Sequence, residues 1–228
     1  NAIEDENLLA IRESLRSTLF YNRSNPKFGL DAGLVVSERK ELLTNGFDTR
    51  KSNELQYNSR INFRKNYNLR IGGAKGELYN SSDFLEGRNY QIEYFEVNPE
   101  FEWLPVRNFR LTTKYSYADK LNVLEEANDD RESATINSFG LECRFTQVSK
   151  RTINLALKYI DIDFEGEENT PVGYELLEAL RPGSNYTWTF NLQQRVAEGL
   201  QISVNYEGRK SNNQAVIHIG RMQISALF

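Results

Sequence analysis

Two neighbouring stretches near the C-terminus decide the fold, Tyr186-Thr-Trp-Thr-Phe-Asn-Leu-Gln193 and Leu200-Gln-Ile-Ser-Val-Asn-Tyr-Glu207. In each stretch an apolar or aromatic residue alternates with a polar one at every step. Successive side chains of a β-strand point to opposite faces, so each stretch predicts a strand with one apolar and one polar face. The residues between the stretches, 195–199, form a short polar connection, and the pair therefore predicts an antiparallel hairpin.

The same alternation continues towards the N-terminus in four further apolar rows: Phe28, Leu30, Ala32, Leu34 and Val36; Leu55, Tyr57, Ile61 and Phe63; Phe109, Leu111, Tyr115 and Tyr117; and Phe139, Leu141, Cys143 and Phe145. Counting all such segments predicts about eleven strands, over residues 15–21, 27–37, 53–63, 67–78, 89–104, 107–119, 133–147, 152–164, 184–194, 199–209 and 213–228. The chain is therefore predicted to be all-β.

Composition excludes several other classes of protein. The 228 residues carry 28 Lys and Arg against 32 Asp and Glu, a net charge of -4 without the basic excess of a nucleic-acid partner. A single cysteine, Cys143, excludes a disulfide framework, and a single histidine, His218, argues against a histidine-based metal site or triad. Mean hydropathy of -0.62 argues against transmembrane helices. We expect no cofactor, and either a soluble β-sandwich or a membrane β-barrel.

The lengths and charges of the connections favour the barrel. Short connections, at 22–26, 64–66, 105–108, 148–151 and 195–199, alternate with long ones near 38–52, 79–88, 120–132 and 165–183. The short connections are mainly basic and the long ones hold acidic clusters, as in outer-membrane barrels with tight periplasmic turns and longer outer loops. The alternation slips phase between Tyr94 and Phe95 and between Tyr159 and Ile160, where we expect a β-bulge or the exit of the strand from the bilayer.

These patterns predict a transmembrane antiparallel up-and-down β-barrel over 14–228, with about 11–12 strands visible, in the outer membrane of a Gram-negative bacterium. Residues 1–13 are predicted to be a helical or linker lead-in, with a twelfth strand over 3–11 as the alternative. Bacterial single-chain barrels have even strand numbers, so eleven strands predict part of a larger barrel. The polar face would line the lumen, with Arg60, Arg70, Glu100, Glu102, Arg110, Lys114, Glu142, Arg144, Lys158, Glu207, Arg209 and Arg221.

The C-terminal strand carries a resemblance. Met222, Ile224, Ala226 and Phe228 share one phase, and the aromatic end resembles the β-signal read by the outer-membrane barrel assembly machinery. The match is partial, because Gln223 and Ala226 stand where that signal has a glycine and an aromatic residue. The motifs Leu180-Arg-Pro-Gly-Ser-Asn-Tyr-Thr-Trp188 and His218-Ile-Gly-Arg221 resemble the C-terminal β-barrel region of large Bacteroidota outer-membrane proteins. That resemblance implies location and architecture and no active site.

The longest outer loop contains an apolar stripe at helical spacing, which predicts a short amphipathic helix over about 172–180. The helix could pack on its own loop, fold over the barrel mouth or contact a surface partner through Leu176, Leu177 and Leu180. His218 shares its phase with Met222 and is expected to face lipid near the outer leaflet.

The predicted function is non-catalytic: a transport conduit, or a membrane scaffold for surface or periplasmic partners. The expected partners are outer-membrane lipid and lipopolysaccharide, the assembly machinery during insertion, and a surface lipoprotein or periplasmic protein. The alternatives are an outer-leaflet lipid-modifying enzyme that uses His218, and a soluble β-sandwich binding module.

Overall fold

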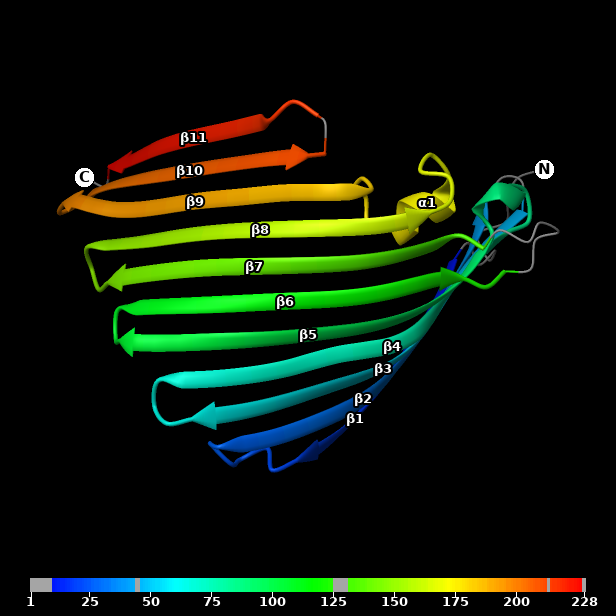
Figure 1. Cartoon of the computed structure of the whole chain (residues 1–228), viewed down its shortest axis with the longest axis horizontal. Coiled ribbons are helices and arrows are strands. Elements are labelled where there is room, and N and C mark those ends of the chain that lie inside the picture. Colours follow the sequence, from blue (N-terminus) through cyan, green and yellow to red (C-terminus); the bar gives the residue numbers. More distant parts are fainter. Residues whose placement is uncertain (1–9, 44–45, 125–130, 213, 227–228) are drawn as a thin grey trace, which may run out of the picture.

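A computed structural model describes residues 10–43, 46–124, 131–212 and 214–226. In these residues eleven strands form one antiparallel sheet in chain order, with one short α-helix and one 3-10 helix at its long-loop end (Figure 1). The elements are β1 (Ala10–Tyr21), β2 (Phe28–Leu43), β3 (Gly46–Phe63), β4 (Tyr67–Ser82), η1 (Glu86–Arg88), β5 (Tyr90–Val106), β6 (Phe109–Asn122), β7 (Ser133–Gln147), β8 (Arg151–Glu165), α1 (Pro171–Leu176), β9 (Gly183–Ala197), β10 (Leu200–Ser211) and β11 (Ile217–Ala226).

Each strand pairs with its neighbours in the chain, which confirms the predicted up-and-down order. The short turns gather at one end of the sheet, and the long connections with α1 lie at the other (Figure 1). Within the described residues β1 pairs only with β2 and β11 only with β10, so the sheet is open along these two edges. No helix of the described residues is long and apolar enough to span a membrane.

The strand registers place the predicted apolar rows on one face of the sheet. Phe139, for example, lies opposite Tyr115 on β6 and Tyr159 on β8. Side chains of this face remain well exposed, with Phe139 at 50% and Tyr115 at 42%, whereas Ser138 on the opposite face is only 6% exposed. Such a difference is expected when the sheet curves around its polar face. The convex surface is therefore apolar, as in the lipid-facing wall of a membrane barrel.

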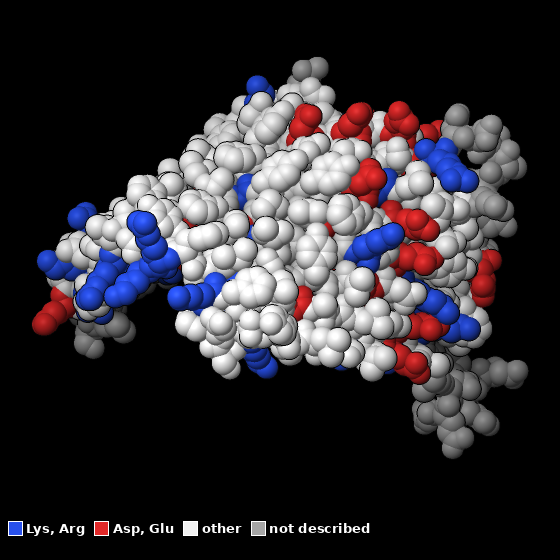
Figure 2. Space-filling view, turned by 60° about the horizontal axis from the view of Figure 1, so that its bottom comes forward, with Lys and Arg blue, Asp and Glu red and all other residues white. Residues whose placement is uncertain are grey.

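Charge is distributed in bands along the strands. In the space-filling view an almost uncharged band crosses the sheet, with basic residues gathered at the short-turn end and acidic and basic residues at the other end (Figure 2). On β6 the uncharged run of the apolar face extends from Phe109 to Tyr117, with Asp119 next. That length agrees with the roughly 9–11 residues that a tilted strand needs to cross a bilayer.

Several predicted boundaries are wrong. Residues 38–52 were expected to be a long loop, but β2 continues to Leu43 and β3 begins at Gly46. This polar extension pairs in register, with an ion pair of 3.1 Å between Lys51 Nζ and Glu38 Oε1. Strand β1 begins at Ala10, so residues 10–13 are strand rather than helix or linker, whereas residues 1–9 lie outside the described part.

The two phase slips have a different cause from the one expected. Strands β5 and β8 keep a continuous register through Tyr94 and Tyr159, without a bulge at either point. Instead, apolar residues change faces. Ile92, Ile160 and Ile162 lie on the polar face of the sheet at its long-loop end, where they are buried at 0%, 4% and 3% exposure. They are apolar because α1 packs on them.

Aromatic rings lie across two glycines of the apolar face. Trp188 is directly opposite Gly208, and a Cβ on this glycine would lie 2.1 Å from the indole ring. Tyr57 covers Gly73 in the same manner, with its ring 2.3 Å from a would-be Cβ. Aromatic residues commonly cover glycines in this way in curved sheets, and the contact fixes the local register.

Candidate functional site

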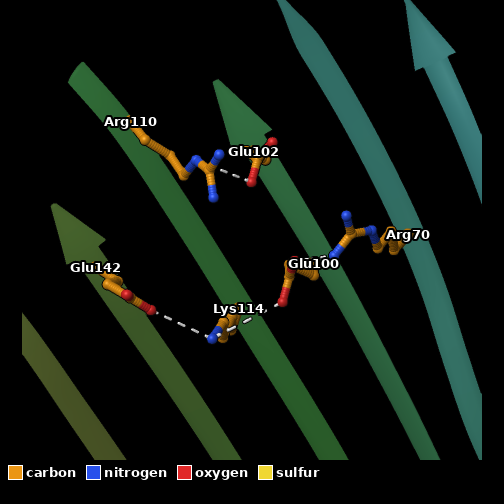
Figure 3. Close-up of polar contacts among 6 residues, drawn as sticks. All are labelled: Arg70, Glu100, Glu102, Arg110, Lys114 and Glu142. Atoms are coloured by element: carbon orange, nitrogen blue, oxygen red, sulfur yellow. Dashed lines mark hydrogen bonds and ion pairs between the residues drawn. The ribbon is translucent and has the colours of Figure 1, made fainter. Parts of the chain in front are cut away.

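The most organised polar feature of the sheet is a ladder of ion pairs on the polar face of β4 to β7. Glu100 on β5 lies 3.3 Å from the Arg70 guanidinium and 3.8 Å from Lys114 Nζ, and Lys114 lies 3.3 Å from Glu142 on β7. A second pair joins Arg110 Nε to a Glu102 oxygen at 3.3 Å. The six side chains project from four neighbouring strands towards one another (Figure 3). The sequence alternation positions them, because each occupies the polar phase of its strand.

The ladder is accessible to water. Its side chains keep between 14% and 52% of their surface exposed, with Arg70 and Lys114 near one half. Ion pairs at this exposure contribute only about 0–1 kcal/mol each to stability. The ladder therefore orders charges along a hydrated wall rather than holding the sheet together.

All twelve residues predicted to line the lumen lie on this polar face. The six outside the ladder are Arg60, Arg144, Lys158, Glu207, Arg209 and Arg221. Arg60 donates through Nη2 to the backbone carbonyls of Arg23 and Asn25 and so fastens the β1–β2 turn. The alternation thus placed the twelve charged residues on one face, and six of them join in the ladder; that this face lines a lumen stays a prediction.

Helix α1 covers the long-loop end of the same face. The helix starts at Pro171, with Thr170 as N-cap, and its Leu176 is fully buried against Tyr90, Ile92 and Ala134. Leu177, at 2% exposure, packs with Ala118, Ile136, Ile160 and Ile162. On β5 to β8 the polar face is therefore apolar at its long-loop end, where the loop covers it, and charged nearer the short turns.

Two ion pairs hold this loop to the sheet. Arg50 on β3 lies 2.7 Å from Glu175 Oε1, and Lys120 on β6 lies 2.8 Å from Glu178 Oε1. Sequence reasoning missed both pairs, because Arg50 falls in a segment expected to be loop and each contact joins distant parts of the chain. The slip of Ile92, Ile160 and Ile162 to the polar face was the one available signal that something apolar covers it.

The expected partner contact through Leu176 and Leu177 is wrong, since both side chains are buried against the chain's own sheet, and Leu180 packs partly with them. The helix is also shorter than predicted and ends at Leu176. It folds back over the sheet, which was one of the expected alternatives.

The predicted residues of β11 that the structure describes, those of the assembly signal and His218, lie on the apolar face. Met222 and Ile224 are exposed on β11, as is Ala226, whereas Phe228 lies outside the described residues. His218 accepts or donates a hydrogen bond of 2.8 Å with the Tyr206 hydroxyl and lies 5.9 Å from Trp188 between ring centroids. Aromatic and amphipathic rings at this position are typical of a membrane interface.

Comparison with solved structures identifies proteins of similar fold. The siderophore receptor PirA from Acinetobacter baumannii aligns over 98% of this chain and 39% of its own length, with a TM-score of 0.68 and 6% identity. The outer-membrane channel DcaP of the same organism aligns over 92% of this chain and 61% of its own, with a TM-score of 0.59 and 10% identity. This chain therefore spans less than two thirds of either relative.

No family model matches the chain, and no curated protein matches its sequence. The structural likeness at such low identity concerns the fold alone. The chain has the antiparallel up-and-down sheet of outer-membrane β-barrel proteins.

Proposed function

We propose that this chain forms the wall of a non-catalytic transport conduit in the outer membrane of a Gram-negative bacterium. The observation that carries the proposal is the division of one sheet into an apolar convex face and a hydrated, charged concave face. A soluble sandwich would bury its apolar face against a second sheet, whereas here that face is exposed. The likeness in fold to a siderophore receptor and an outer-membrane channel supports this location.

The half-exposed ladder supports a conduit over a solid plug. Charged side chains inside a barrel are tolerated where water reaches them, and Arg70, Lys114 and Glu142 keep roughly half of their surface exposed. The loop that holds α1 over β5 to β8 would narrow the outer mouth. The resemblance of the C-terminal motifs supports a host among the Bacteroidota as part of this proposal.

The test is electrical. Full-length protein, purified in detergent and reconstituted in planar bilayers, is expected to conduct in discrete steps. Its folded state is checked first by the mobility of unboiled and boiled samples on gels. A folded protein that shows no conductance at any voltage would overturn the conduit.

A scaffold for surface or periplasmic partners is the second candidate, and one observation favours it. Leu176 and Leu177 cover the long-loop end of the polar face on β5 to β8, and two ion pairs hold their loop there, so this loop would occlude part of a barrel interior. A folded but silent protein that co-purifies with a stoichiometric lipoprotein or periplasmic protein after crosslinking would support the scaffold.

A further inference from the structure

The strand register lines up charged residues of the polar face into rows that run across the sheet. In one row direct cross-strand partners lead from β3 to β10 and hold five cations with one carboxylate: Arg60, Arg70, Glu100, Lys114, Lys158 and Arg209. Gly140 and Thr187 complete the row without adding charge. This row is strongly basic.

The neighbouring row on the side of the short turns is acidic. It holds the carboxylates Glu102, Glu142 and Glu207. Beyond them a third row holds three arginines and three asparagines, Arg110, Arg144, Asn154, Asn191, Asn205 and Arg221. It contains no carboxylate among its paired residues. A narrow acidic row therefore lies between two basic ones.

The ion pairs leave a positive excess in these rows. They hold eight cations and four carboxylates, and the ladder uses three of the cations and three of the carboxylates. Among the residues that the structure describes, Arg144, Lys158 and Arg209 have no carboxylate at ion-pair distance. Arg144 lies directly opposite Arg110, a like charge.

This excess is local. The whole chain has a net charge of -4, and the long-loop half of the polar face carries both signs, with Glu54 and Glu96 beside Arg16, Arg50 and Lys120. At the short-turn end a hollow of about 630 Å³ is lined by Lys27, Arg64 and Lys65, with Glu102 as its acidic residue. The positive zone therefore extends from the middle of the sheet to its short-turn mouth. A low-dielectric wall with an excess of one sign of charge attracts ions of the other sign.

We infer that the conduit prefers anions and that its solutes are small anionic molecules, such as carboxylates or phosphates, attracted by the unpaired cations Arg144, Lys158 and Arg209. This inference rests on the proposed transport function. The arginines offer fork-shaped donors that suit carboxylate and phosphate oxygens. The side-chain amides of Asn154, Asn191 and Asn205 lie in the row of Arg144 and add neutral hydrogen-bond donors along the path.

The experiment measures ion selectivity in planar bilayers with the full-length protein and a tenfold gradient of KCl. The reversal potential is expected to have the sign of chloride preference, with a chloride-to-potassium permeability ratio above about 3. The triple variant Arg144→Gln, Lys158→Gln and Arg209→Gln is expected to lower this ratio at least about twofold. The matched control, Lys40→Gln, Lys51→Gln and Lys75→Gln, removes the same charge from the opposite face and is expected to leave the ratio unchanged.

The outcomes separate the two proposals. Conductance with a zero reversal potential, or one of cation sign, overturns the anion preference and leaves the conduit standing. Equal shifts in the triple variant and its control also overturn the assignment to these residues. A folded protein without conductance overturns the conduit and the preference together. If the triple variant fails the gel test for folding, the single variant Arg144→Gln is measured in its place. Together with the sign of the wild-type reversal potential, its chloride-to-potassium permeability ratio then decides whether the anion preference holds.

Discussion

The docking of α1 gives a prediction whose magnitude follows from the structure. Leu176 and Leu177 are 0% and 2% exposed. Burial of two such side chains contributes about 3–6 kcal/mol, at 1.5–3 kcal/mol each. The ion pairs Arg50–Glu175 and Lys120–Glu178 are partly exposed on at least one side, and together they contribute less than about 2 kcal/mol. The leucines, rather than the charges, should hold the helix on the sheet.

The perturbation is the double variant Leu176→Ala and Leu177→Ala. Each truncation of a buried leucine costs roughly 2–5 kcal/mol, so the undocked population should rise by more than about a hundredfold. A glutamyl endopeptidase then cleaves after Glu175 and Glu178 at a rate that follows this population. Mass spectrometry of the fragments separates these cuts from those after the outer-loop residues Glu167 and Glu168.

Two comparisons make the result decisive. Arg50→Gln with Lys120→Gln removes both ion pairs and should accelerate cleavage no more than about thirtyfold. Tyr174→Ala changes a side chain of the same helix that is 63% exposed and should leave the rate unchanged. If the charge variant released the helix as readily as the leucine variant, the reasoning from burial would be refuted. A leucine variant as protected as wild type would refute it equally.

Three further predictions concern the sheet. Gly208→Ala places a Cβ 2.1 Å from the Trp188 ring, whereas a Cβ at Gly220 meets open space. Overpacking should lower the unfolding free energy of Gly208→Ala by about 1–3 kcal/mol, measured by urea unfolding with tryptophan fluorescence. Equal urea midpoints for Gly208→Ala and Gly220→Ala would contradict the ring contact. Leu157, on the apolar face, is 47% exposed, and Leu157→Arg should lower the unfolding free energy in lipid bilayers by about 2–4 kcal/mol. Ala156→Arg, on the polar face, should lower it much less. The same loss of stability in both variants would argue against a lipid-facing band. Glu100→Gln should change the unfolding free energy by less than about 1 kcal/mol. The same variant should increase the chloride preference, because Arg70 and Lys114 lose their shared carboxylate partner. An unchanged reversal potential would count against a role of the ladder in ion selectivity.

Most of the fold was predictable because one face of every strand had to be apolar along its middle. The rows through Leu55, Phe109, Phe139 and Tyr186 needed only a period of two, and the short turns marked their ends. The same alternation sorted the charged residues of the ladder onto one face. Periodicity is a local property, and these features are set locally.

What alternation could not supply is the contact between distant segments. The phase slips at Ile92 and Ile162 predicted a bulge or the exit from the bilayer, whereas the cause is the packing of the distant α1 segment on these residues. Hairpin β2–β3 was not predicted between residues 38 and 52, because this part is mostly polar on both faces and lacks the apolar alternation of a half-buried strand. Both misses arise where the chain leaves the apolar band.

The length of β3 has a consequence for the outside of the cell. It contains 18 residues against 12 in β10, and the difference lies at the long-loop end. At about 3.3 Å per residue, six extra residues raise this side of the rim by roughly 20 Å along the strand. The outer edge of the wall is a slope rather than a level ring. With the long loops on the cell surface, as the loop lengths predict, an antibody or a phage that approaches the intact cell would meet the long-loop ends of β2 and β3, at Leu43 and Gly46, well before the end of β10 at Ser211.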